Sequence, residues 1–172
     1  MANAHTPPAH QAFMLENAAE LSPERHDIVQ KILANYMGRV LPENFAYYDV
    51  DATFEDSLGL ALGVRAIESQ FIALARLVRG MELLHCSVAR DAPDCLELNV
   101  SIRYQLMFNQ EKTLPFLMVL RFGENDKIIA HEDRWHHQPL YRATDGFIGR
   151  CAEIMRYTSG KVMELCFPPP TH

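Results

Sequence analysis

The side chains best suited to acid–base chemistry lie between positions 131 and 135, where the sequence reads His-Glu-Asp-Arg-Trp. If this segment is a strand, His131, Asp133 and Trp135 share one face, because alternate side chains of a strand point the same way. We expect this face to be buried, since Ile129 shares it and the opposite face is charged. A neighbouring imidazole and carboxylate can exchange a proton near neutral pH, so the pair is a candidate catalytic centre. The alternative is a hydrogen-bonded pair with a purely structural role.

Further polar side chains are candidates for the same surroundings. His85 is expected on a strand that borders this face, and four tyrosines could contribute phenol groups: Tyr36, Tyr47, Tyr48 and Tyr104. Two more histidines, His136 and His137, follow the segment closely. Strand alternation places His136 on the opposite face from His131, so we expect no metal site there.

Composition excludes several classes of protein. The chain has 172 residues, 48% of them hydrophobic and 22% charged, which is typical of one globular domain. Its formal net charge of −6 argues against nucleic acid as a partner. No apolar run approaches the roughly 20 residues that span a bilayer, and the N-terminus does not read as a secretory signal, so we expect no membrane association and a cytoplasmic location. The glycine spacings match no phosphate-binding or dinucleotide motif, so no cofactor is expected.

The elements that position these side chains can be predicted from periodicity. Ser22 is a good N-cap for a helix with apolar residues at helical spacing, which Pro42 ends after position 41. A second amphipathic helix is predicted over residues 64–78 and a C-terminal helix over residues 145–167. The four cysteines show no paired spacing, and we expect them to be reduced.

Between the second and the last helix the periodicity changes to that of strands. The segment 95–108 alternates most clearly, with apolar residues at every second position from Leu96 to Phe108. Further strands are predicted over residues 83–90, 113–122 and 127–136, and residues 45–54 form a loop or short strand. This order predicts an α+β fold with helices on one side of an antiparallel sheet.

The motifs and their order resemble the nuclear-transport-factor-two-like superfamily, whose members include ketosteroid isomerase, scytalone dehydratase and the SnoaL-like polyketide cyclases. The resemblance covers roughly residues 24–137. It is carried by Asp-Ala-Thr-Phe-Glu-Asp-Ser-Leu-Gly at 51–59, Gly-Val-Arg-Ala-Ile at 63–67, Arg-Phe-Gly-Glu-Asn-Asp-Lys-Ile-Ile at 121–129 and His-Glu-Asp-Arg-Trp at 131–135.

The resemblance implies a cone-shaped, strongly curved sheet wrapped around the N-terminal helices, with a pocket for a small apolar molecule. The domain would span residues 9–167, with the core at 24–137 and a C-terminal helical extension at 145–167. Tails at 1–8 and 168–172 would flank it. A second copy of the chain is a further expected partner, because such sheets often mediate homodimers. We expect these residues to line the pocket: Tyr36, Phe54, Phe71, His85, Tyr104, Phe116, Met118 and Trp135.

Asp56 is a third candidate catalytic residue, because it aligns with the general base of ketosteroid isomerase. An apolar pocket would raise its pKa toward values useful for proton transfer. The tyrosine and the second acid of that enzyme align with Ile32 and Met118, so steroid isomerisation itself is not expected. The alternative is that Asp56 caps the loop before Gly59.

Two functions remain open at this stage. The first is a cofactor-independent isomerase, cyclase or dehydratase in which Asp56, His131 or Asp133 moves a proton. The second is a non-catalytic ligand-binding or dimerisation module in which side chains fill the cone.

Overall fold

The computed structural model describes residues 12–18, 21–106, 108 and 110–170. The predicted N-terminal tail lies outside this part of the chain. The first helix, α1 (Pro23–Tyr36), begins where expected, and the Ser22 hydroxyl accepts a hydrogen bond of 3.2 Å from the Arg25 amide. It ends earlier than the sequence suggested, because Gly38 adopts a positive φ of 75° that terminates the helix before Pro42. A short 3₁₀ helix, η2 (Pro42–Phe45), follows it.

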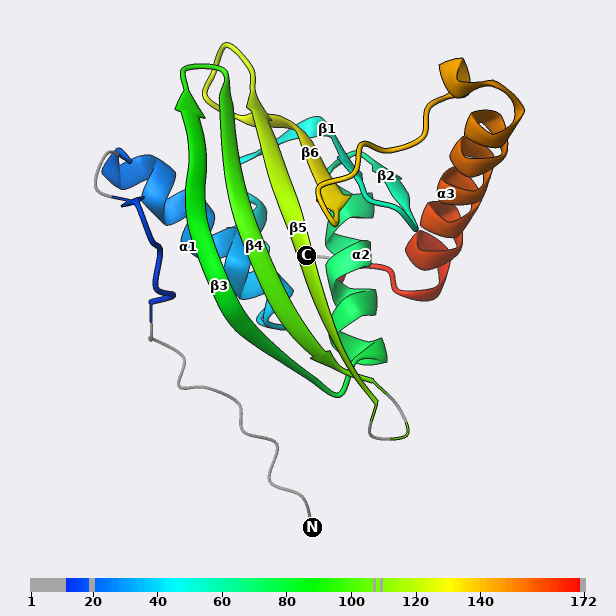
Figure 1. The fold of residues 1–172 in the computed structure, drawn as a ribbon, viewed down its shortest axis with the longest axis horizontal. Coiled ribbons are helices and arrows are strands. Elements are labelled where there is room, and N and C mark those ends of the chain that lie inside the picture. The colour runs from blue at the N-terminus through cyan, green and yellow to red at the C-terminus, as the bar shows by residue number, and fades with distance from the viewer. Residues whose placement is uncertain (1–11, 19–20, 107, 109, 171–172) are drawn as a thin grey trace.

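Six strands form one sheet in the order β2-β1-β6-β5-β4-β3. Their bounds are β1 (Tyr48–Glu55), β2 (Leu60–Leu62), β3 (Gly80–Ala92), β4 (Cys95–Gln105), β5 (Glu111–Phe122) and β6 (Ile128–Trp135). Neighbouring strands are antiparallel except β1 and β6, which run parallel, so the sheet is mixed where the sequence suggested an antiparallel one. The parallel pair arises because the last strand returns to the first one after the β3–β4–β5 meander (Figure 1).

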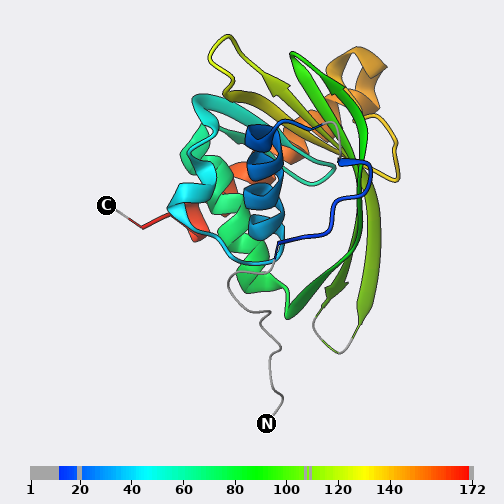
Figure 2. The ribbon, with the colours of Figure 1, turned by 90° about the vertical axis from the view of Figure 1, so that its left-hand side faces the viewer.

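The sheet curves around two helices, α1 and α2 (Val64–Leu77), which lie together on its concave side (Figure 2). Another 3₁₀ turn, η4 (Ala143–Asp145), leads into α3 (Gly146–Cys166), which lies outside the cone beside β2 and α2 (Figure 1). The α+β class, the cone and the added C-terminal helix are therefore confirmed. None of the helices in the described part of the chain is long and apolar enough to cross a membrane.

The core lies between the two helices and the concave face of the sheet. Its fully buried members come from α1, α2 and the long strands and include Ile28, Ile32, Leu33, Ile67, Phe71, Leu96, Leu98, Ile102, Phe116, Met118, Leu120 and Ile128. The four cysteines are all free thiols.

Two expected core positions are wrong. A bulge between Arg121 and Phe122 pairs Phe122 with Ile128, which is buried, and turns Ile129 outward, where it is 45% exposed. The strand β4 ends at Gln105, so Phe108 lies beyond the alternating segment with a positive φ and is 87% exposed.

Candidate functional site

Four polar side chains meet in the interior of the cone. Tyr36 is the last residue of α1 and Tyr48 is the first of β1. His131 and Asp133 lie on β6, where alternation directs both toward the concave face. Only 1% of His131 and 2% of Asp133 are exposed to solvent. The expected convergence of the histidine and the aspartate is therefore present, and two tyrosines join them.

The neighbours of this cluster are set by strand register. Leu120 of β5 pairs with His131, and Met118 pairs with Asp133. On the other side of β6, Phe54 of β1 pairs with His131, and the two rings meet edge to face with centroids 4.9 Å apart. Aromatic and aliphatic side chains thus surround the cluster and exclude water from it.

The four side chains form one hydrogen-bonded network. The Tyr48 hydroxyl lies 2.7 Å from Nδ1 of His131. Nε2 of the same ring lies 3.3 Å from the Tyr36 hydroxyl, which donates to Oδ2 of Asp133. Nε2 also lies 3.3 Å from Oδ1 of Asp133.

These contacts fit an imidazole that is protonated on Nε2. With the tautomer protonated on Nε2, Tyr48 donates to Nδ1, Nε2–H donates to the Tyr36 oxygen, and Tyr36 donates to Asp133. Every donor then has an acceptor, and all the bonds run toward the carboxylate. Burial raises the pKa of the Tyr36 and Tyr48 hydroxyls well above the ordinary value, and the nearby Asp133 charge raises them further. Both phenols therefore stay protonated and act as donors.

One oxygen of the Asp133 carboxylate takes no part in these hydrogen bonds. Oδ1 of Asp133 is buried and accepts no hydrogen bond from the described residues, although Nε2 of His131 lies 3.3 Å from it. A buried carboxylate oxygen without a partner is costly, and such exceptions call for an explanation such as a catalytic role or a bound water. This oxygen is where an external donor would bind.

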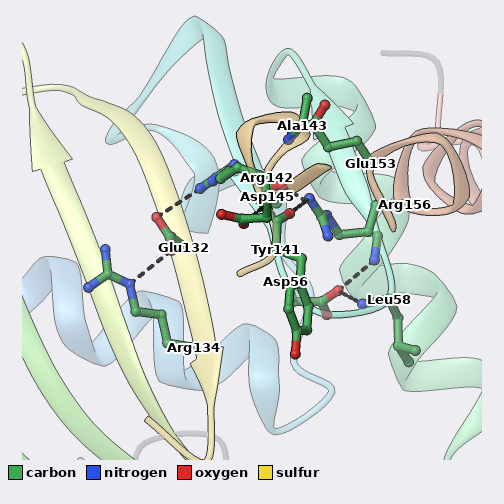
Figure 3. Close-up of polar contacts among 12 residues, drawn as sticks. Asp56, Leu58, Glu132, Arg134, Tyr141, Arg142, Ala143, Asp145, Glu153 and Arg156 are labelled. Carbon is green, nitrogen blue, oxygen red and sulfur yellow. Dashed lines mark hydrogen bonds and ion pairs between the residues drawn. The ribbon is translucent and has the colours of Figure 1, made fainter. Parts of the chain in front are cut away.

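Asp56 follows β1 and has no hydrogen bond to the network among the described residues, although the Asp133 charge contributes to its pKa. Figure 3 shows its carboxylate next to Leu58. Its Oδ1 accepts the Leu58 amide at 2.7 Å and the Gly59 amide at 2.6 Å, the arrangement of a loop cap. Burial raises its pKa to about 6, against the two amide bonds, which lower it. The structure therefore shows the capping contacts, and also a carboxyl group able to bind or release a proton near neutral pH.

Of the eight side chains expected to line a pocket, six are buried inside the cone: Tyr36, Phe54, Phe71, Tyr104, Phe116 and Met118. Trp135 is partly buried at the end of β6. His85 does not belong to this set. It follows a bulge in β3, its side chain is 40% exposed, and it contacts Ser87 at 3.0 Å and Glu16 at 3.3 Å.

Side chains fill much of the cone. The Tyr36 ring packs edge to face on Phe71 at 5.0 Å and lies 5.6 Å from Phe116. Two hollows in the described residues lie elsewhere, and neither reaches the network. One of about 330 Å³ adjoins Arg65 and Lys161, and one of about 140 Å³ adjoins Phe122.

The sequence gives only weak signals for the two tyrosines of the network. It does not distinguish Tyr48 from the other candidate tyrosines, yet the Tyr48 hydroxyl directly contacts His131. Tyr36 lies one helical turn after Ile32, so it shares the inward face of α1, and this spacing was the available signal. The buried Arg156, which bonds Glu55 at 2.9 Å, gave no signal in the sequence. Among the described residues, no group of three or more His, Cys, Asp or Glu side chains is arranged to hold a metal ion.

No protein-family model matches the sequence, and no curated protein matches it. Solved structures do match its fold. An NTF2-like (nuclear-transport-factor-two-like) protein from Anabaena variabilis ATCC 29413 matches with a TM-score of 0.57 and 11% identity, covering 64% of this chain and 85% of that one. A proposed polyketide cyclase from Xanthomonas campestris pv. campestris matches with a TM-score of 0.53 and 15% identity, covering 62% and 86%.

A third match is SalBIII, an epoxide hydrolase/cyclase-like enzyme in pyran ring formation in polyether salinomycin. Its TM-score is 0.51 and its identity 18%, covering 65% of this chain and 90% of that one. At these identities the likeness concerns the fold, and the chain has the NTF2-like, SnoaL-like fold.

Proposed function

We propose that this protein is a cofactor-independent enzyme that moves a proton on a small, largely apolar molecule bearing a carbonyl or hydroxyl group. The observation that carries the proposal is the network of Tyr36, Tyr48, His131 and Asp133, buried among aromatic rings with Oδ1 of Asp133 unpartnered. Isomerisation, cyclisation and dehydration are the reactions that this set of groups suits.

Each group has a role in such a reaction. Oδ1 of Asp133 accepts a proton from a carbon or hydroxyl group of the substrate, and the carboxylate becomes a carboxylic acid. The same proton returns to another atom of the substrate, to a new carbon in an isomerisation or to a departing hydroxyl in a dehydration. Tyr36 and His131 hold the carboxylate in position and stabilise its negative charge before the transfer. No oxidant, reductant or metal is needed.

Asp56 is the second acid–base group of the proposal. Its pKa of about 6 lets it bind or release a proton near neutral pH. The negative charge of Asp133 contributes to raising this pKa, so the two carboxyl groups are coupled electrostatically. The enzymes of similar fold named above, a proposed polyketide cyclase and an epoxide hydrolase/cyclase-like enzyme, support this class of chemistry.

A non-catalytic module is the second candidate, and the filled cone favours it. Met118 is buried and pairs with Asp133, and Phe116 is buried against the Tyr36 ring, so a molecule that reached Asp133 would meet both side chains. For catalysis these side chains must move, and the flexible thioether of Met118 is the easier of the two to displace.

Proton transfer can be tested without knowing the product. We would incubate the protein in D₂O with a panel of cyclic and aromatic ketones and follow deuterium incorporation next to the carbonyl by NMR. Small molecules that copurify with the protein, identified by mass spectrometry, would extend the panel. We expect exchange above the buffer rate, lost in Asp133→Leu and strongly reduced in His131→Gln.

The matched control is Asp27→Leu, because Asp27 also accepts a tyrosine hydroxyl, at 2.6 Å, but on the partly exposed side of α1. This variant should exchange at the wild-type rate. Exchange that is equal in wild type and Asp133→Leu would remove the carboxylate from the mechanism. A wild-type protein that binds a copurifying molecule but exchanges no proton in it would favour the binding module.

A further inference from the structure

The outer face of α3 carries an apolar surface that stays exposed among the residues that the structure describes. Five side chains form this α3 stripe, and Phe147 and Leu165 at its two ends are each 81% exposed. Its members are Phe147, Ile154, Met155, Val162 and Leu165. At 1.5 Å per residue the 21-residue helix is about 31 Å long, so the stripe runs along most of it. Exposed apolar surfaces of this extent mark interaction sites.

The opposite face of α3 fixes the direction of the stripe. Arg156 is buried there and bonds Glu55 at 2.9 Å and the Tyr141 carbonyl at 2.7 Å. Gly160 packs so closely on β2 that an added Cβ would lie 1.9 Å from the Leu60 oxygen. The helix therefore cannot turn its apolar side inward without losing these contacts, and Figure 1 shows α3 at the margin of the molecule.

The two ends of the stripe lie symmetrically about the middle of the helix. Phe147 and Leu165 lie nine residues on either side of Arg156, and Ile154 and Thr158 lie two residues on either side. When two identical helices pair antiparallel about a two-fold axis, residues equally far from the centre meet. Phe147 then packs on the partner's Leu165, and Ile154 on the partner's Thr158, in the pattern of an antiparallel coiled coil.

Charges beside the stripe are complementary in this arrangement. Arg150 and Glu164 lie on one side of it, seven residues on either side of Tyr157. Their centre is one residue beyond Arg156, because positions that flank the seam of an antiparallel coiled coil are offset from the pairs within it. An antiparallel pair brings Arg150 next to the partner's Glu164, and the symmetry makes this ion pair twice. A parallel pair would instead place the two arginines at one end and the two glutamates at the other. Glu164 also holds Lys161 at 2.7 Å in its own chain, which leaves its carboxylate able to accept a second cation.

We propose that α3 pairs antiparallel with α3 of a second copy of this chain, and that the C-terminal extension is thus the homodimer interface. A second copy is the occupant because the end residues of the stripe and the flanking charges are self-complementary. The proposal is independent of the proposed catalytic activity.

The test is light scattering of the full chain after size-exclusion chromatography, over a range of concentrations. We expect a dimer for the wild type and a monomer for Ile154→Glu. Glu164→Arg should weaken the dimer about tenfold, because two ion pairs are replaced by two repulsions. Adding Arg150→Glu to that variant restores opposite charges in swapped order, so affinity should return. Glu124→Arg, in the exposed β5–β6 turn, is the matched control and should leave the dimer unchanged.

The charge swap keeps the test independent of misfolding, because a variant that unfolds α3 would not be rescued by a second reversal. Circular dichroism and melting temperatures would be measured for each variant. A wild type that is monomeric at all concentrations would overturn the proposal. So would a dimer that persists in Ile154→Glu, or a charge swap that fails to restore affinity.

Discussion

Removing the Tyr36 hydroxyl should destabilise the protein much more than removing a similar hydroxyl at the surface. Tyr36→Phe deletes the donor to Oδ2 of Asp133 and leaves a buried carboxylate whose Oδ1 already lacks a partner. A hydrogen bond to a charged group contributes about 1.5–3 kcal/mol, and the unsatisfied charge adds to the loss. We therefore expect a decrease of about 3 kcal/mol in the free energy of unfolding, or roughly 6–12 °C in the melting temperature of a chain of this length.

A double-mutant cycle with Asp133→Leu isolates this contact. Leucine has nearly the shape of aspartate, and replacing both partners with apolar groups of the same shape can be close to neutral. Tyr36→Phe should therefore cost little in the Asp133→Leu background, which gives a coupling energy of about 2 kcal/mol in urea unfolding. Tyr47→Phe is the matched control, since its hydroxyl bonds Asp27 near the surface and should be worth no more than about 1 kcal/mol. A cost of Tyr36→Phe that is the same in both backgrounds would refute the assigned network.

Three further results are expected. The pKa of Asp56 rises on folding from 3.8 to about 6, so its proton stabilises the folded state below about pH 4, and this stabilisation is lost as the pH rises through 6. In urea unfolding, Asp56→Asn should therefore gain stability relative to wild type at pH 7 and gain less at pH 4. The opposite trend would contradict the raised pKa. Gly160→Ala, whose Cβ would meet a β2 oxygen at 1.9 Å, should release α3 and speed its hydrogen exchange, while Ser159→Ala should not. Met118→Ala should open a cavity beside Asp133 that binds phenol more tightly than toluene, because only phenol can donate a hydrogen bond to Oδ1. Thermal shift would measure the binding, and equal binding of the two would mean that Oδ1 is not available to a donor.

The fold could be predicted from sequence where periodicity and local signals agree. The Ser22 cap, the second helix and the long alternating strand β4 all depend on neighbouring residues, and each begins within a few residues of the predicted position. His131 and Asp133 were placed correctly for the same reason, because two residues on one strand keep their relation whatever the sheet does around them.

Contacts that depend on tertiary register could not be predicted in this way. The bulge at Arg121 reverses the direction of Ile129, and nothing in the strand pattern marks where it occurs. His85 follows another bulge and points to the surface instead of the cone. The approach of Tyr48 to His131 requires β1 to pair in parallel with β6, a pairing that brings together segments about 80 residues apart.

The burial of this network is itself an argument about function. Four polar groups inside an aromatic core do not maximise stability, because well-packed apolar residues of similar volume often serve as well or better than a buried charged pair. With His131 protonated on Nε2, the hydrogen bonds run from Tyr48 through His131 and Tyr36 to Asp133, and Oδ1 of this carboxylate accepts none of them. A network that served only to hold the core together would gain by satisfying that oxygen, for instance with a further hydroxyl. A carboxylate oxygen that accepts no hydrogen bond in an apolar environment instead binds an external donor more strongly, which is the property that a proton acceptor requires.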